Sequence, residues 1–296
     1  MQTSIFSDFL LPASLSVIMI GMGMSLERRD FKNVILYPRA MLTGILCQLI
    51  ILPLIAFLLV GFSGLDPVFK VGFIIITACA GGAATNLITH LLRGNVALSI
   101  SLTAINSLIV LVSLPLIVNL SLILFLGEER ELHLPVMNTV GNILLTIILP
   151  TIAGMSIRYH FYRFTVRMQK PLKFILPAIL LVVFIVVMFF DNPDGESDIF
   201  GYLHLLPWAL GLNFISMLAV YFTARTMRLG GKNNFTLSIE VGLKNSIIGI
   251  YVAKSLIGDH DMTMVSVIYG SFTFFSTLLF GYVFKRLEIG WPRWLS

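Results

Sequence analysis

Charged side chains are scarce in this sequence of 296 residues, where Asp, Glu, Lys and Arg together make up 12%. A soluble domain carries about 25% of such residues, so the composition excludes a water-soluble globular fold. Hydrophobic residues make up 57% and the mean hydropathy is +0.94, which predicts a polytopic membrane protein. The net charge of +5 does not indicate nucleic-acid binding, because the basic residues are scattered between apolar runs.

Cysteine and histidine are also rare. The two cysteines, Cys47 and Cys79, lie in separate apolar segments, which excludes a disulfide framework and a CxxC-type metal or redox site. The five histidines show no pairing at metal-ligand spacing, and no Ser/His/Asp set falls at one membrane depth. We therefore do not expect an enzyme.

Long polar connections are missing as well. A spanning helix needs roughly 20 mostly apolar residues. On that rule the sequence predicts an all-α fold with nine transmembrane helices, at about 9–26, 37–61, 68–92, 96–126, 134–157, 171–190, 203–224, 235–256 and 262–284. Connections of about a dozen residues leave no room for a soluble domain, so we expect residues 1–296 to form a single transmembrane unit.

Positive charge is almost absent from alternate connections. Sixteen of the 20 Lys and Arg fall on one side of the predicted membrane, and the positive-inside rule makes that side cytoplasmic. The N-terminus is then outside and the C-terminus inside a plasma (inner) membrane. The leader "MQTSIFSDF" has no positive charge and no cleavage site follows it, so we do not expect a signal peptide.

Two predicted spans break their apolar pattern near the middle, at "FIIITACAGGAATNLITHLL" (73–92) and "FTLSIEVGLKNSIIGIYVA" (235–253). Freed backbone groups at membrane depth need partners in protein or in a wet cavity, so both breaks should lie in the interior. The two spans run in opposite directions, which is typical of an inverted-repeat transporter with its site at the midplane. Alternatively, Gly81 and Gly82 only permit close helix packing.

Acidic residues within the predicted spans are limited to Glu240, and an ionised group there costs roughly 3 kcal/mol to insert. A helix would bring Lys244 beside it, so a merely neutralising ion pair is one interpretation. The other is a cation site, because a hard monovalent cation prefers several oxygens, one of them charged. Ser99, Thr103 and Asn106 share one helical face. The oxygens that could form the site belong to Thr85, Asn86, Ser99, Thr103 and Glu240.

The stretches "GGAATNLITHLLRGNVALSISLT" and "SIEVGLKNS" resemble the bile acid:sodium symporter family, in its bacterial, nine-helix form. The likeness extends from "MIGMGMSLERRDF" to the last span. It implies a panel domain and a core domain that move against each other, with two discontinuous helices crossing in the core. We place the core at about 67–130 and 203–260, and the panel at about 9–61, 134–190 and 262–286.

The resemblance also implies site residues. It assigns a first sodium site to the five oxygen-bearing residues named above. Substrate would lie near Ala83, Ala84 and Asn245, and the second-site positions would be Gln48, Glu240, Val241, Leu243 and Lys244. Related proteins have glutamine where this chain has Lys244, and an ammonium cannot coordinate sodium because it has no lone pair. The ammonium could instead bond to Glu240 and Gln48.

The expected function is therefore secondary active symport of Na⁺ with an organic anion, such as a bile-acid-like molecule or a small carboxylate, by alternating access and with one sodium site. The alternatives are a cation/proton antiporter and a proton-coupled carrier of organic anions. The expected partners are the substrate and the lipid bilayer; no nucleic acid or obligate protein partner is expected.

Overall fold

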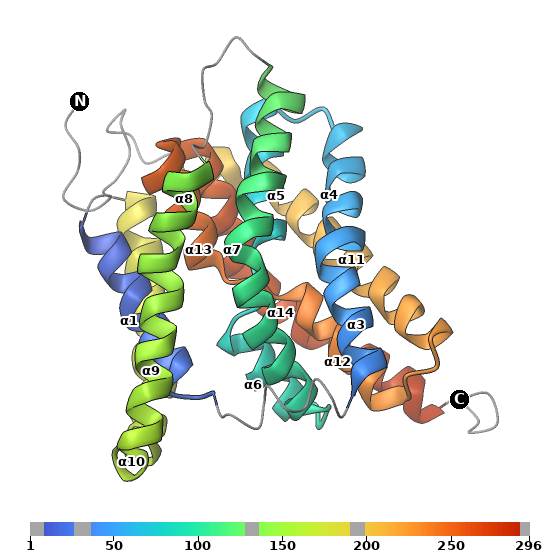
Figure 1. Ribbon diagram of the computed structural model, residues 1–296. Coiled ribbons are helices and arrows are strands. Elements are labelled where there is room, and N and C mark those ends of the chain that lie inside the picture. The colour runs from blue at the N-terminus through green and yellow to red at the C-terminus, as the bar shows by residue number, and fades with distance from the viewer. Residues whose placement is uncertain (1–8, 27–36, 128–135, 190–198, 291–296) are drawn as a thin grey trace.

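The computed structural model describes residues 9–26, 37–127, 136–189 and 199–290, and these parts of the chain contain helices but no strand (Figure 1). Five helices are long and apolar enough to cross a membrane, or six if the bent pair Tyr162–Leu172 and Phe174–Met188 forms one span. An all-α membrane fold is thus confirmed, while the count of nine spans stays a prediction.

The helices follow the predicted segments with shifted boundaries. They are α1 (Leu11–Gly23), α3 (Pro38–Leu46), α4 (Leu52–Gly61), α5 (Pro67–Ala78), α6 (Ala83–Leu91), α7 (Val96–Leu126), α8 (Val136–Ile143), α9 (Leu149–His160), α10 (Tyr162–Phe189), α11 (Leu206–Thr226), α12 (Gly231–Gly242), α13 (Ser246–Tyr251) and α14 (His260–Gly290). Wider π-helical turns occupy Cys47–Ile51, Leu144–Ile148 and Val252–Ile257, and a 3₁₀ turn occupies Ile199–Leu205. Proline opens α3 and α5, where its missing N–H would have no intrahelical partner.

Both predicted breaks are present. Helix α5 ends at Ala78 and α6 begins at Ala83, while α12 ends at Gly242 and α13 begins at Ser246. The backbone is extended after each first half, with ψ 150° at Cys79 and ψ 129° at Leu243. The two breaks also bond to each other, since the Asn245 N–H donates to the Ala80 carbonyl over 2.9 Å. Two segments far apart in the sequence therefore meet at one point.

The helices pack in two groups (Figure 1). Helices α1, α9 and α10 pack on one another, while α4, α5, α7, α11, α12 and α14 pack among themselves. Residues 37–61 and 262–286, which we expected in the panel, therefore lie against the broken helices. Hydropathy alone could not reveal this, because it marks a helix as membrane-embedded without marking the neighbour it faces.

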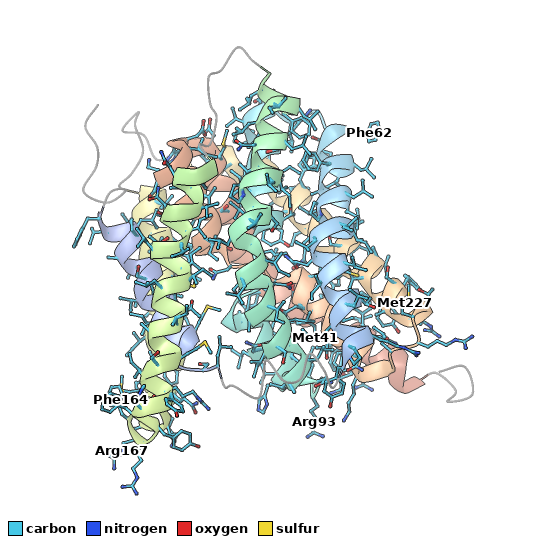
Figure 2. All side chains as sticks on the ribbon, viewed as in Figure 1. Met41, Phe62, Arg93, Phe164, Arg167 and Met227 are labelled. Carbon is cyan, nitrogen blue, oxygen red and sulfur yellow. The ribbon has the colours of Figure 1, made fainter. Side chains whose placement is uncertain are left out.

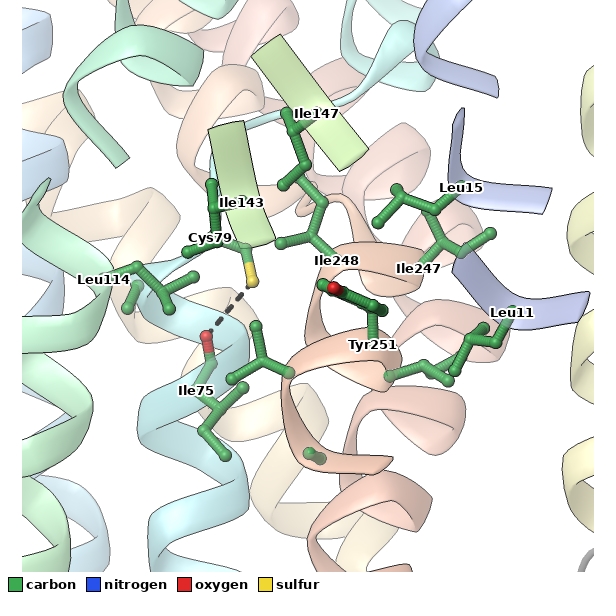
Figure 3. Packing of buried hydrophobic residues seen from close by; sticks show 14 of the residues in the cluster. Leu11, Leu15, Ile75, Cys79, Leu114, Ile143, Ile147, Ile247, Ile248 and Tyr251 are labelled. Carbon is green, nitrogen blue, oxygen red and sulfur yellow. Dashed lines mark hydrogen bonds between the residues drawn. The ribbon is translucent and has the colours of Figure 1, made fainter. Parts of the chain in front are cut away.

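An apolar interface joins the two groups where α10 contacts α14 and where α1 contacts α13, which itself packs on α14. Figure 3 shows its centre, in which Leu11 and Leu15 of α1 lie near Ile247 and Tyr251 of the second broken helix. Within the first group, α1 and α9 approach to backbone contact. A Cβ at Gly23 would lie 2.1 Å from the Thr151 carbonyl oxygen, so only glycine fits there.

Candidate functional site

Glu240 lies on the last turn of α12 and its side chain is 2% exposed. Two hydroxyls of α7 donate to it: Thr103 Oγ1 to Oε1 over 2.6 Å, and Ser99 Oγ to Oε2 over 2.8 Å. The helical periodicity that aligned Ser99 with Thr103 therefore does bring both of them to the carboxylate. Hydrogen bonds to an ionised acceptor are stronger than neutral ones, which helps to offset the burial of the charge.

The beginning of α6 supplies the remaining oxygens. Asn86 Oδ1 lies 2.8 Å from Ser99 Oγ, whose single proton can serve either Asn86 or Glu240. Thr85 Oγ1 donates to the Gly82 carbonyl over 2.7 Å and lies 3.4 Å from Thr103 Oγ1. The structure thus brings together all five residues predicted for the first cation site. Their carboxylate, hydroxyl and amide oxygens have the chemistry that a hard cation prefers.

Two neighbouring glycines of the first break have different roles. A Cβ at Gly81 would lie 2.6 Å from Glu240 Oε1, so the carboxylate can occupy its position only because residue 81 has no side chain. A Cβ at Gly82 would meet nothing closer than 3.8 Å. The backbone of Gly82 is extended, a conformation open to any residue. Close approach to Glu240 is therefore the structural requirement at Gly81.

Lys244 and Gln48 form a second buried contact, in which Lys244 Nζ donates to Gln48 Oε1 over 2.6 Å. The amide of Gln48 cannot be reversed, because its Nε2 donates to the Cys79 carbonyl over 2.9 Å and a carbonyl can only accept. Gln48 lies in the π-helical turn Cys47–Ile51, a local widening of the helix that often accompanies functional sites.

Lys244 does not lie beside Glu240 as a helical neighbour. Helix α12 ends at Gly242 and Leu243 is extended, which removes the i, i+4 relation expected from the sequence. The described chain shows the predicted bond from Lys244 to Gln48, but no ion pair within 4.0 Å joins Lys244 to Glu240. A direct neutralising ion pair is therefore not what holds the two charges in place.

The carbonyl of Gly242 is freed where α12 ends, and it lies between Val241 and Leu243, whose carbonyls the resemblance assigned to a second site. Asn213 Nδ2 of α11 donates to it over 2.6 Å, and the Tyr269 hydroxyl of α14 donates over 3.0 Å. We did not predict Asn213 or Tyr269. An isolated amide inside an apolar span, which drew attention to Gln48, was the available signal for Asn213.

The three predicted substrate positions lie where the second halves of the broken helices begin. Ala83 and Ala84 open α6, and Asn245 immediately precedes α13. Asn245 Nδ2 lies 3.9 Å from Met22 Sδ, so it faces α1 across the boundary between the two helix groups. Asn106, one turn beyond Thr103, is 1% exposed and its Oδ1 has no partner in the described chain.

An apolar counterpart of the Glu240 site exists at the other half-helices. A Cβ at Gly249 of α13 would lie 2.5 Å from Ser266 Oγ of α14 and 3.1 Å from Ile76 Cδ1 of α5. The Ser266 hydroxyl is buried and has no partner in the described chain. Helices α5, α13 and α14 here correspond to α12, α6 and α7 at the Glu240 site: the first half of one broken helix, the second half of the other, and the long helix that follows that second half. This second set of three residues contains no acid.

Comparison with known proteins identifies the family. The model of the sodium bile acid symporter family matches residues 12–194, which is more than half of the chain. A protein of Bacillus subtilis named as an uncharacterized sodium-dependent transporter, YocS, is 30% identical over 244 residues. The match covers 81% of this chain and 72% of the Bacillus protein.

Eukaryotic relatives match over similar lengths. A probable sodium/metabolite cotransporter of Arabidopsis thaliana chloroplasts, BASS1, is 26% identical over 249 residues, which cover 83% of this chain and 59% of the plant protein. Sodium/bile acid cotransporter 4 of Homo sapiens is 27% identical over 278 residues, which cover 92% of this chain and 62% of the human protein. The chain thus spans about three fifths of the length of these two relatives.

Proposed function

This chain belongs to the sodium bile acid symporter family, whose members are membrane transport proteins and not enzymes, and we propose that it is a symporter. In this proposal it couples the entry of Na⁺ to the entry of an organic anion. The observation that carries the proposal is the buried Glu240 carboxylate, held by Ser99 and Thr103 at the meeting point of two broken helices. A carboxylate surrounded by hydroxyl and amide oxygens is a suitable ligand set for a transported monovalent cation.

Alternating access follows from motion of one helix group against the other. Helices α1, α9 and α10 form the panel in this proposal, and the helices around the two breaks form the core. Their apolar interface, with Leu15 on one side and Ile247 on the other, contains few directional bonds to break as the groups slide. The backbone contact at Gly23 keeps α1 and α9 together as one body.

The substrate binds beside the crossing, between Asn245 and the start of α6. The N–H groups at a helix start attract anions, and the Asn245 amide offers hydrogen bonds to a carboxylate or sulfonate. The relatives are named for metabolites and for bile acids, and both classes are compatible with an organic anion. The Met22 thioether nearby supports an adaptable apolar wall for the rest of the molecule.

Lys244 takes the place of a second sodium ion. Its Nζ already uses Gln48 Oε1, an oxygen that the family resemblance assigns to the second cation. One sodium ion therefore accompanies each turnover.

The charge distribution supports a cytoplasmic C-terminus, because the basic residues Arg93 and Arg167 lie together at the end of the molecule opposite Phe62 (Figure 2).

The test is the thermal stability of the purified protein in sodium and in potassium, followed by uptake in proteoliposomes. Na⁺ at about 100 times its dissociation constant should stabilise the folded state by about 2.7 kcal/mol. Glu240→Gln should abolish this sodium-specific increase in melting temperature and sodium-driven uptake. Asp66→Asn, which removes an exposed carboxylate, is the control and should retain both.

Two results would contradict the proposal. One is a wild-type protein that is equally stable in sodium and potassium. The other is a sodium gradient that drives proton movement without any organic anion, which would favour the cation/proton antiporter.

A further inference from the structure

Glu240 and Lys244 are the only charged residues that are buried in the part of the chain the structure describes, with 2% and 6% exposure. Glu240 lies on α12 just before the second break and Lys244 lies within the break. Their partners belong to the same helix group: α7 for Glu240, and the π-helical turn before α4 for Lys244. Both charges therefore travel with the same moving body when the two groups slide.

The net charge of this pair is zero when the two residues hold one proton between them, whichever of the two carries it. An ionised carboxylate with an ammonium sums to zero, and so does a protonated carboxyl with a neutral amine. Moving an elementary charge through the membrane potential changes the free energy substantially, whereas a neutral body moves without sensing it. The empty core is therefore electrically neutral in its buried part.

We propose that this protein transports one monovalent anion with one sodium ion and moves no net charge in either half of its cycle. The inference rests on the function proposed above, because it adopts the stoichiometry of one sodium ion per turnover. That stoichiometry follows from the bond between Lys244 and Gln48, which leaves no free Gln48 oxygen for a second ion. Na⁺ and a monovalent anion cancel, so the loaded core is as neutral as the empty one. A divalent anion would leave the loaded core with a negative charge, which selects against such substrates.

Lys244 is the residue that sets this property. With glutamine in its place, residues 48 and 244 would offer two neutral amides, and amide oxygens can accept a cation where an ammonium cannot. A second sodium ion could then bind near the Leu243 carbonyl, and the cargo would gain one positive charge. Transport would become sensitive to the membrane potential.

The experiment measures sodium-driven uptake of radiolabelled taurocholate, pyruvate and pantoate into proteoliposomes, with succinate as the divalent comparison. Potassium gradients and valinomycin set the potential to 0 or −100 mV inside, at a fixed sodium gradient. For wild type we expect the same steady-state accumulation of the transported monoanion at both potentials, and poor uptake of succinate. For Lys244→Gln we expect accumulation about 50-fold higher at −100 mV, the effect of one extra charge. Lys244→Arg, which retains the cation, should remain insensitive to potential.

The outcomes separate the two proposals. Uptake that requires sodium but rises with negative potential in wild type overturns the neutral cycle and leaves sodium symport standing. Potential-independent uptake by Lys244→Gln, at wild-type sodium stoichiometry, overturns the role of Lys244. Absence of sodium-driven uptake of every anion overturns the proposed function and the neutral cycle with it. If Lys244→Gln fails to fold, the wild-type comparison at the two potentials still decides.

Discussion

The two broken helices of this protein have the same frame and different chemistry. At each break a side-chain amide from a neighbouring span donates to a freed carbonyl: Gln48 to Cys79 at the first, and Asn213 to Gly242 at the second. Only the second broken helix contributes charged residues at its break, Glu240 and Lys244. The support of the backbone is duplicated, whereas the charged chemistry is present once.

The surroundings of Glu240 and Ile76 show the same difference at the level of single residues. Glu240 has Ser99 and Asn86 as neighbours, and Ile76 lies near Ser266 and Gly249. Each trio takes one residue from the first half of a broken helix, one from the second half of the other, and one from the long helix that follows that second half. A buried carboxylate is costly, so one cation site needs only one of the two positions to be acidic.

The largest loss of sodium binding among these variants is expected when a methyl group is added at the first break. Gly81→Ala would place a carbon 2.6 Å from Glu240 Oε1 and force the carboxylate to move. Overpacking of this kind costs about 1–3 kcal/mol, which corresponds to sodium binding weakened by roughly fivefold to 150-fold. Sodium titrations followed by thermal unfolding measure it.

Gly82→Ala is the matched control for Gly81→Ala, because its new Cβ would make only ordinary contacts at 3.8 Å. It should retain nearly wild-type sodium binding. Equal losses in both variants would show that flexibility of the break matters more than the position of Glu240.

A comparable effect, on the stability of the fold and not on sodium binding, is expected from removing the side chains that support the breaks. Gln48→Ala leaves the Cys79 carbonyl without this donor and Lys244 without this acceptor, which should lower the free energy of unfolding by about 1–3 kcal/mol. Tyr269→Phe should cost less, because the Gly242 carbonyl keeps the Asn213 amide as a donor. Thermal unfolding without sodium measures both.

The double variant Asn213→Ala with Tyr269→Phe should destabilise at least as much as Gln48→Ala, because it removes both donors to the Gly242 carbonyl and the bonds of Asn213 to Ser276 and Thr277. If Tyr269→Phe alone destabilises as much as Gln48→Ala, the shared hydrogen bonding at Gly242 does not protect the second break.

The smallest effects distinguish the two serines. Ser99→Ala removes a hydrogen bond to an ionised carboxylate, and about tenfold weaker sodium binding is expected for a loss of about 1.4 kcal/mol. Ser266→Ala removes a hydroxyl without a partner in the described chain and should leave sodium binding unchanged. Sodium-dependent thermal shifts compare them. A loss of sodium binding in Ser266→Ala would mean that the apolar counterpart also takes part in the site.

Much of the site could be predicted from local sequence pattern. Glycines beside polar residues in an apolar span indicated both breaks, and the helical spacing of Ser99 and Thr103 indicated the face that meets Glu240. These predictions succeed because backbone groups cannot remain unpaired in lipid, so a break leaves a clear mark in composition.

Features that depend on tertiary packing were not predictable in the same way. The position of Lys244 depends on where α12 ends, and a one-residue difference in a helix end changes the direction of every later side chain. In the sequence, nothing distinguishes Tyr269 from other aromatic residues of a membrane helix. Its hydrogen bond to the Gly242 carbonyl depends on how α14 packs against the second break. The grouping of 37–61 and 262–286 depends on which apolar faces meet, and hydropathy is nearly the same on all faces.

The burial of both native thiols has a practical consequence for labelling. Cys47 and Cys79 are free and fully buried, so a maleimide dye added to the folded protein should react with an introduced exposed cysteine far faster than with either of them. Pairs of labels can therefore be placed in the native background, without first making a cysteine-free variant. A pair across α1 and α9, which touch backbone to backbone, would serve as a fixed ruler. A pair across α1 and α11 would report the distance between the two helix groups.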